Sequence, residues 1–271
     1  MANRAAAFRE RLKRFNTPSM RSWDRPPAWR TAGMKRNVAL DCGWGRLIFG
    51  QTFADHESII RLFQSEPEGR RDLAIYVPDH HVLVARAPDL LFVDPSYTYR
   101  LWLHADRIEP VRLPSRFLIR FLRDERDAEQ VNRLYARCGM IPSPVETILR
   151  NQHTRVFSYF VAEDRLDNTV VGTIMGVDHR EAFGDPDNGA SFWCLAVDPL
   201  RQAKGLGRAL ISRLLDSYRA RGRHYVDLSV LYDNRKAIRL YRSMGFRRVP
   251  VYVVKRKNAL NRSFYKGGPK R

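Results

Sequence analysis

Cysteine is scarce in this sequence, and its three copies lie far apart. Cys42, Cys138 and Cys194 form no CxxC pair and no cluster with histidine. An odd number of scattered cysteines argues against a disulfide framework and against structural zinc, and it is typical of a reducing compartment. We therefore expect a cytoplasmic protein that binds no metal.

Long apolar runs are missing as well. No stretch approaches the roughly 20 residues that cross a bilayer, and the N-terminus lacks the apolar segment of a secretory signal. Apolar residues nevertheless make up 44% of the 271 residues and aromatic residues 11%, which is enough to build a core. The sequence predicts a globular protein without a membrane span.

Acidic residues are few at the two ends of the chain, and this explains much of the net charge of +19. Residues 1–36 have a net charge of +8, and residues 247–271 have a net charge of +9 with no acidic residue. The residues between them carry +2. Basic ends can contact RNA or an acidic partner, but the folded body lacks a strong charge of its own. Nucleic-acid binding is therefore not the expected main role, although a ribosome-associated module stays as an alternative.

Composition and element order divide the chain into four segments. We expect a basic N-terminal arm, a small α/β accessory domain, a main domain and a basic C-terminal tail, at residues 1–36, 37–114, 115–256 and 257–271. Within the arm, the apolar spacing predicts a short amphipathic helix at residues 4–15.

The accessory segment has strand-like runs but no catalytic constellation. Three such runs lie at residues 73–77, 82–85 and 91–93, separated by Pro-Asp turns. His80 and His81 precede the second run, and adjacent residues of a strand point to opposite faces, so the two cannot ligate one metal. We expect this segment to shape the substrate site, with a linker at residues 107–114.

The main segment is organised around one strand, one loop and one helix. Residues 192–197 form an apolar run that predicts a buried strand, which ends at Asp198-Pro199. A basic loop with two glycines follows, and then a helical apolar pattern that stops near Gly222. Free backbone amides and the helix dipole favour an anion at such a helix start. The arrangement predicts a phosphate site.

Two motifs in this segment resemble those of the GCN5-related N-acetyltransferase (GNAT) superfamily. Gln202-Ala203-Lys204-Gly205-Leu206-Gly207 matches the pyrophosphate loop of that family, Gln/Arg-x-x-Gly-x-Gly/Ala. Asn234-x-x-Ala237-x-x-Leu240-Tyr241-x-x-x-Gly245-Phe246 matches its second signature. Ala203 is a departure, since many members have glycine there. The predicted order β-α-α-β-β-β-α-β-α-β over residues 116–255 is also that of the family.

The resemblance implies a fold, a co-substrate and a set of site residues. The fold would be of the α/β (α+β) class, with a mixed, mainly antiparallel twisted sheet flanked by helices. Acetyl-CoA would place its pyrophosphate on the glycine loop and its pantetheine along the main chain of the preceding strand, where two strands of the sheet part. The residues assigned to acetyl-CoA in this way are Leu195, Ala196, Val197, Gln202, Ala203, Lys204, Gly205, Leu206, Gly207, Arg208 and Asn234.

The same resemblance assigns a general acid, whereas the base stays open. Tyr241 occupies the position of the family's proton donor to the departing thiolate, and a phenol is protonated at neutral pH. Many members keep a glutamate in the strand at residues 192–197, but this sequence has no carboxylate there. Asp178 and Asp227 are candidate bases, with His179 and Glu163 as further candidates at predicted strand ends.

Further stretches are similar to the acetyltransferase half of the N-acetylglutaminylglutamine synthetase family. They are Asn16–Arg21, Asn37–Arg46, Gly176–Arg180 and Lys255–Ala259. In that family an ATP-grasp ligase usually follows, and this sequence has none. The expected function is acetyl transfer to an amine, such as the α-amine of glutaminylglutamine in osmolyte synthesis, with a separate ATP-grasp ligase as a possible partner. A non-catalytic acetyl-CoA-binding regulator of such a ligase is the other alternative.

Overall fold

The computed structural model describes residues 31–104, 113–201 and 204–266 of the chain. The predicted helix at residues 4–15, most of the predicted linker, and residues 267–271 of the tail lie outside these ranges, as do Gln202 and Ala203. The strands are Ala39–Asp41 (β1), Arg46–Phe49 (β2), Leu73–Ile75 (β3), Leu91–Val93 (β4), Ser96–Trp102 (β5), Phe117–Phe121 (β6), Phe157–Asp164 (β7), Thr169–Asp178 (β8), Gly189–Val197 (β9), Tyr225–Leu231 (β10), Arg247–Val249 (β11) and Val254–Arg256 (β12).

Helices connect most of these strands. The α-helices are His56–Gln64 (α3), His80–Arg86 (α4), Glu125–Arg137 (α5), Val145–Gln152 (α6), His179–Phe183 (α7), Leu206–Ala220 (α8), Arg235–Ser243 (α9) and Arg262–Tyr265 (α10). Short 3-10 turns lie at Gly50–Thr52 (η2) and Ala259–Asn261 (η3). No helix among the described residues is long and apolar enough to cross a membrane.

Two open sheets form the framework. The larger one has seven strands in the order β11-β5-β10-β9-β8-β7-β6, and its pairs are antiparallel except β9 with β10. The smaller one has the order β1-β2-β3-β12-β4, with β2 and β3 parallel. This mixed α/β arrangement, with a mainly antiparallel sheet flanked by helices, confirms the predicted fold class.

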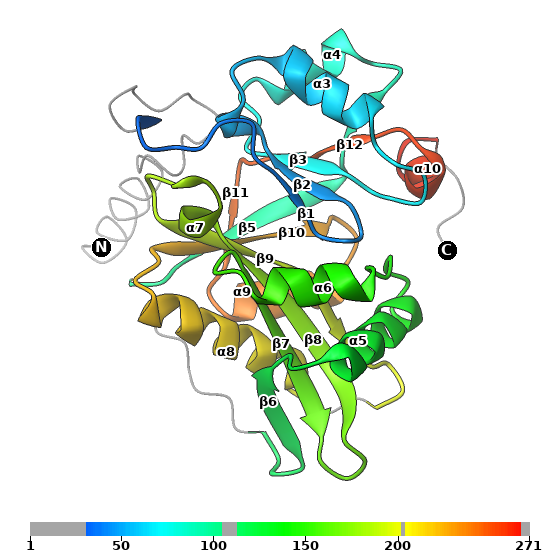
Figure 1. Cartoon of the computed structure of the whole chain (residues 1–271), viewed down its shortest axis with the longest axis vertical. Helices are drawn as coiled ribbons and strands as arrows, with labels where there is room; N and C mark the ends of the chain where they lie inside the picture. The colour runs from blue at the N-terminus through cyan, green and yellow to red at the C-terminus, as the bar shows by residue number, and fades with distance from the viewer. Residues whose placement is uncertain (1–30, 105–112, 202–203, 267–271) are drawn as a thin grey trace, which may run out of the picture.

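The sheets and helices stack in layers (Figure 1). Helices α3 and α4 cover the outer face of the smaller sheet, where Ile59, Phe63 and Leu83 share a cluster with Ile48. The inner face of that sheet packs with α5, α6 and one face of the larger sheet. Helices α8 and α9 pack on the opposite face of the larger sheet. The larger sheet is therefore buried on both faces. This agrees with the continuous apolar sequence of its central strands, because a strand buried on both faces has no polar side.

Strands that follow one another in the sequence belong to different sheets at two places. The strand pairing therefore does not follow the expected division between residues 114 and 115. β5 comes directly after β4 of the smaller sheet but pairs with β10 and β11. β12 comes after β11 of the larger sheet but pairs with β3 and β4. Sheet pairing depends on contacts between segments distant in sequence, which a reading of one segment at a time misses. The chain crosses between the sheets twice.

Two other predicted elements are corrected by the structure. The run at residues 82–85 is part of helix α4, in which Leu83 is buried and Val82 is exposed. Such a short apolar run does not distinguish a strand from a helix. The last predicted strand, at residues 246–254, is two strands in different sheets, because Pro250 cannot donate to a ladder and interrupts it.

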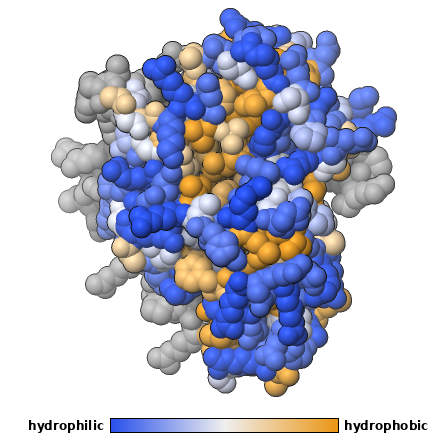
Figure 2. Space-filling model, in the orientation of Figure 1, coloured by the Kyte–Doolittle hydropathy of each residue, from blue (hydrophilic) through white to orange (hydrophobic). Residues whose placement is uncertain are grey.

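Apolar side chains are also visible at the surface (Figure 2). They gather in the upper and central parts of this face, between hydrophilic margins. Exposed large apolar residues include Val82 on α4 and Tyr252 between β11 and β12. Tyr252 also lines a hollow between the β3–α4 turn and the β11–β12 connection.

Candidate functional site

Strands β9 and β10 run side by side for a short distance and then part. Their parallel pairing extends from Tyr225 opposite Gly189 to Asp227 opposite Ser191. Farther on, β9 stays with β8 as far as Val197, and β10 stays with β5 as far as Leu231. Amides of Phe192 to Val197 that point away from β8 therefore have no strand partner among the described residues and can meet a ligand. We call the point after the Asp227–Ser191 pair the fork.

A bulge interrupts β9 just beyond the fork. The register of β8 and β9 shifts between Thr173 and Met175, and Cys194 has a φ of 53°. A left-handed non-glycine residue in a strand is unusual, and bulges redirect the backbone groups of the strand that carries them. Leu195, Ala196 and Val197 follow the bulge, and they are the residues predicted to lie along pantetheine.

The N-terminus of α8 follows β9 and has free donors. Its N-cap residue is Gly205, with a φ of 90° and no side chain to cap the first amides. There is no acidic residue in the first turn, and Lys204 is exposed beside it. Within the part of the chain that the structure describes, no partner engages the amides of Leu206, Gly207 and Arg208, which therefore offer donors to an anion at the positive end of a 15-residue helix.

Gly207 and Arg208 are positioned by contacts with neighbouring elements. A Cβ atom on Gly207 would lie 3.7 Å from Val197 and from Leu240, which is ordinary contact rather than a clash. A Cβ at position 207 would therefore cause no clash, whereas Gly205 has the left-handed φ that favours glycine. The guanidinium of Arg208 donates to the hydroxyl of Ser243, which links the start of α8 to the end of α9.

Tyr241 extends from α9 toward the fork. Its side chain is 6% exposed, and its ring lies 5.8 Å from the ring of Phe192, the first β9 residue beyond the fork. Burial raises the pKa of the Tyr241 hydroxyl. The phenol is therefore protonated at neutral pH, as a proton donor must be, and no hydrogen bond occupies it within the described ranges.

Asn234 has a structural role in addition to the predicted one. It is the N-cap of α9, and its Oδ1 accepts a hydrogen bond from the Ala237 amide at 3.1 Å. Asparagine is a preferred residue at this position, since its oxygen satisfies one of the first free amides of a helix. The residue is exposed at the end of the β10–α9 turn.

Each of the two candidate bases forms an ion pair with an arginine, so the geometry favours neither of them as a base. Asp227 is fully buried and accepts two hydrogen bonds of 2.7 Å from Arg100 and one of 2.6 Å from Tyr76. Asp178 is fully buried, accepts from Arg223 at 2.8 Å and caps helix α7. A carboxylate that already accepts hydrogen bonds from a guanidinium has few lone pairs left for a substrate proton.

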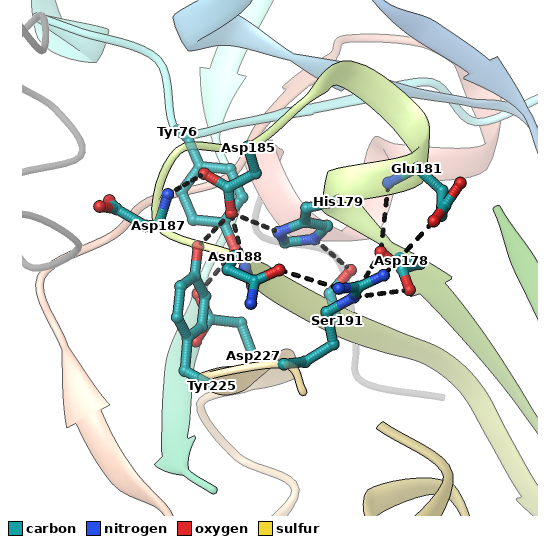
Figure 3. Close-up of polar contacts among 12 residues, drawn as sticks. Tyr76, Asp178, His179, Glu181, Asp185, Asp187, Asn188, Ser191, Tyr225 and Asp227 are labelled. Atoms are coloured by element: carbon teal, nitrogen blue, oxygen red, sulfur yellow. Dashed lines mark hydrogen bonds and ion pairs between the residues drawn. The ribbon is translucent and has the colours of Figure 1, made fainter. Parts of the chain in front are cut away.

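The further candidate Glu163 is occupied in the same way, by Arg120 at 2.8 Å on the β6–β7 side of the sheet. His179, the fourth candidate, belongs to a buried network that the sequence analysis did not predict (Figure 3). Its Nε2 lies 2.9 Å from the Ser191 hydroxyl, and its Nδ1 lies 3.8 Å from Asp185.

Asp185 is stabilised as an anion in this network. Burial alone would raise the pKa of its carboxyl, but the nearby His179 and the amides of Gly189 and Asp187 lower it overall. Tyr225 donates to the same carboxylate at 3.1 Å. The network therefore fixes Ser191, on the last paired position before the fork. Short polar residues spread over residues 178–191 gave no periodic signal that could have revealed it.

The ion pair of Asp227 and Arg100 provides a prediction of stability. Burial lowers the pKa of Arg100, and the carboxylate of Asp227 more than offsets this and raises it. Arg100→Met would leave the Asp227 charge buried, so we expect a loss of about 3–5 kcal/mol in the free energy of unfolding.

Urea unfolding followed by circular dichroism measures this loss. Arg61→Met is the matched control, because Arg61 pairs with Glu57 at 3.9 Å on an exposed helix surface. That variant should lose less than about 1 kcal/mol. Equal losses in the two variants would contradict the assignment of Arg100 to a buried, paired site.

Comparisons with known proteins agree with this geometry. Residues 119–246 match the model of the Acetyltransferase (GNAT) family. Solved structures of GCN5-related N-acetyltransferases from Sphaerobacter thermophilus and Kribbella flavida are similar in fold. Their TM-scores are 0.52 and 0.54, with 21% and 12% sequence identity, and the matches cover 74% and 83% of this chain and 64% and 90% of those chains. Residues 119–246 are therefore similar to an acetyltransferase domain of the GNAT family.

Curated relatives match shorter stretches. The mycothiol acetyltransferase of Thermobifida fusca is 39% identical over 90 residues, covering 32% of this chain and 28% of the relative. That of Acidothermus cellulolyticus is 34% identical over 157 residues, covering 52% and 47%. The L-methionine sulfoximine/L-methionine sulfone acetyltransferase of Salmonella typhimurium is 46% identical over 50 residues, covering 18% and 29%. The chain thus spans less than half the length of each of these relatives.

Proposed function

We propose that this protein transfers an acetyl group from acetyl-CoA to the amine of a small acceptor. One observation carries the proposal: the parallel pairing of β9 and β10 ends at a fork, beside a helix N-terminus without a side-chain cap. Both features lie inside the segment that matches the GNAT family. An extended chain with a pyrophosphate at one end fits this pair of features.

The described residues support a specific placement of acetyl-CoA. The amides of Leu206 to Arg208, with Gly205 and Lys204, would bind the pyrophosphate, and Gln202 and Ala203 belong to the same proposed loop. Pantetheine would follow Leu195, Ala196 and Val197 on the edge that β10 leaves free. Asn234, at the end of the β10–α9 turn, would lie near the thiol end.

The reaction forms one bond and breaks another. The nitrogen of the neutral amine attacks the thioester carbonyl, a C–N bond forms, and the C–S bond breaks. The amine loses one proton to water, the departing thiolate gains one from Tyr241, and the Tyr241 phenolate then takes a proton back from water. Free amides of β9 would polarise the carbonyl. We assign no side-chain base, because Asp178 and Asp227 are paired with arginine, and a peptide α-amine with a pKa of about 8 needs little help to be neutral.

For the acceptor we propose the α-amine of a small peptide such as glutaminylglutamine, in osmolyte synthesis with an ATP-grasp ligase as partner. The sequence resemblance in Asn37–Arg46 and Gly176–Arg180 supports this choice. Methionine sulfoximine, the substrate in the name of one relative, is a second and smaller amine. Both have an α-amine beside a polar side chain.

Product analysis tests the activity. The purified chain is incubated with acetyl-CoA and with glutaminylglutamine or methionine sulfoximine, and acetylated products are identified by mass spectrometry. We expect acetyl-CoA-dependent acetylation of at least one amine, with CoA released in equal amount. Binding of acetyl-CoA without any acetylated product would contradict catalysis and favour a regulatory acetyl-CoA-binding domain.

A further inference from the structure

A hollow lies between the turn from β3 to α4 and the connection from β11 to β12. Its volume is about 310 Å³, and its wall includes Tyr76, Asp79, His80 and Tyr252. This size is within the range of small-molecule sites. Nothing in the acetyl-CoA site accounts for it, because its walls come from residues 76–81 and 250–252 rather than from the glycine loop.

The backbone of this turn is strained at two positions. Tyr76 has a φ of 55° and Asp79 a φ of 49°, and neither is glycine. Left-handed conformations at such residues cost free energy and persist where the surrounding structure holds them, often at ligand sites. Both strained residues line the same hollow, which is the first reason to regard it as a site.

The polar groups of the hollow suit an amine. Asp79 is the N-cap residue of α4, but its carboxylate makes no capping hydrogen bond and is exposed. The ring of His80 stacks on Tyr252, with their centroids 4.5 Å apart. Burial and the neighbouring His81 lower the pKa of His80, although the carboxylate of Asp79 acts in the opposite direction. The imidazole is therefore neutral at pH 7. An anion and a hydrogen-bond acceptor thus stand together beside two aromatic rings.

One residue joins this hollow to the fork. The Tyr76 hydroxyl donates to Asp227 at 2.6 Å, and Asp227 is the β10 member of the last pair before β9 and β10 part. A ligand against the Tyr76 ring is therefore one side chain away from the fork. Val251 packs in the same cluster as Tyr76 and Trp193 of β9, which brings the other wall to the same face of the sheet.

From these observations we propose that the hollow binds the acceptor, a small primary amine, with Asp79 accepting a hydrogen bond from the amine and Tyr252 packing against the rest of the molecule. The proposal rests on the acetyl transfer proposed above. It also gives the smaller sheet a function, because β3, α4 and the residues before β12 form the acceptor side while β9 and α8 form the acetyl-CoA side.

The test compares KM for the acceptor with acetyl-CoA affinity in Asp79→Asn and Tyr252→Ala. Glutaminylglutamine and methionine sulfoximine are the acceptors, and acetyl-CoA binding is measured separately by calorimetry. Asparagine tolerates the left-handed backbone at position 79, so the first variant removes charge without new strain. We expect each variant to raise KM for the acceptor about 10-fold or more while acetyl-CoA affinity stays within about twofold.

Asp89→Asn is the matched control, since Asp89 is an exposed aspartate beyond α4 that does not line the hollow. It should leave KM unchanged. Unchanged KM in both pocket variants of an active enzyme would overturn the acceptor site and leave acetyl transfer standing. Failure of the unaltered chain to acetylate either amine would overturn both, and the two failures are therefore distinguishable.

Discussion

Gly205→Val is expected to weaken acetyl-CoA binding by about 100-fold or more, because it disrupts the start of α8 where the pyrophosphate would lie. Gly205 has a φ of 90°, a conformation that a β-branched residue avoids. Valine would either force the loop into another conformation or place its side chain beside the free amides. Isothermal titration calorimetry of acetyl-CoA with the purified variant measures the effect.

Gly222→Val is the matched control for strain. Gly222 follows the other end of α8, has a φ of 69° and has no atom within 4 Å of where a Cβ would lie. Both variants should lose stability by about 1–2 kcal/mol, the usual cost of a left-handed residue. Acetyl-CoA affinity should fall in Gly205→Val and not in Gly222→Val, and equal affinities would contradict the placement of the pyrophosphate.

Tyr241→Phe is expected to lower kcat by about 10²- to 10⁴-fold while acetyl-CoA affinity stays nearly unchanged. The substitution removes a buried, protonated hydroxyl and keeps the ring that packs on Phe192 and Phe246. Loss of proton donation to the thiolate acts on the transition state rather than on ground-state binding, so kcat and not KM carries the effect. Steady-state release of CoA gives kcat.

Tyr218→Phe provides the comparison for Tyr241. Tyr218 is also a buried tyrosine of the same apolar cluster, and its hydroxyl has no hydrogen-bond partner among the residues described. It lies on α8 and not at the position of the family's proton donor, so the loss of its hydroxyl should leave kcat unchanged within about twofold. If Tyr241→Phe retained the full rate, Tyr241 would not be the acid, and another donor or water would have to supply the proton.

Local patterns in the sequence were enough to predict strand β9, the turn after it and helix α8. The apolar run at residues 192–197, the glycine loop and the apolar spacing up to Tyr218 correspond to β9 and α8. Strand, turn and helix start are adjacent in sequence, so short-range preferences determine them. The assignments to acetyl-CoA, to Tyr241 and to Asn234 remain predictions, which the variants above address.

Interactions between distant segments were not predictable in the same way. β5 was missed, although Tyr97, Tyr99 and Leu101 alternate in it, because its partners β10 and β11 lie more than 120 residues away. The same strand brings Arg100 to Asp227, and that contact removes Asp227 from the candidate bases. A charged residue in a strand does not reveal its partner until the pairing is known.

The most direct test of the account is the thermal melting of the unaltered chain with and without saturating acetyl-CoA. A ligand at about 100 times its Kd that binds the folded state alone adds about 2.7 kcal/mol of stability. We expect a clear rise in Tm with acetyl-CoA and a much smaller rise in the Gly205→Val variant. An unchanged Tm for the unaltered chain would contradict acetyl-CoA binding at the fork and the start of α8, and with it the proposed function.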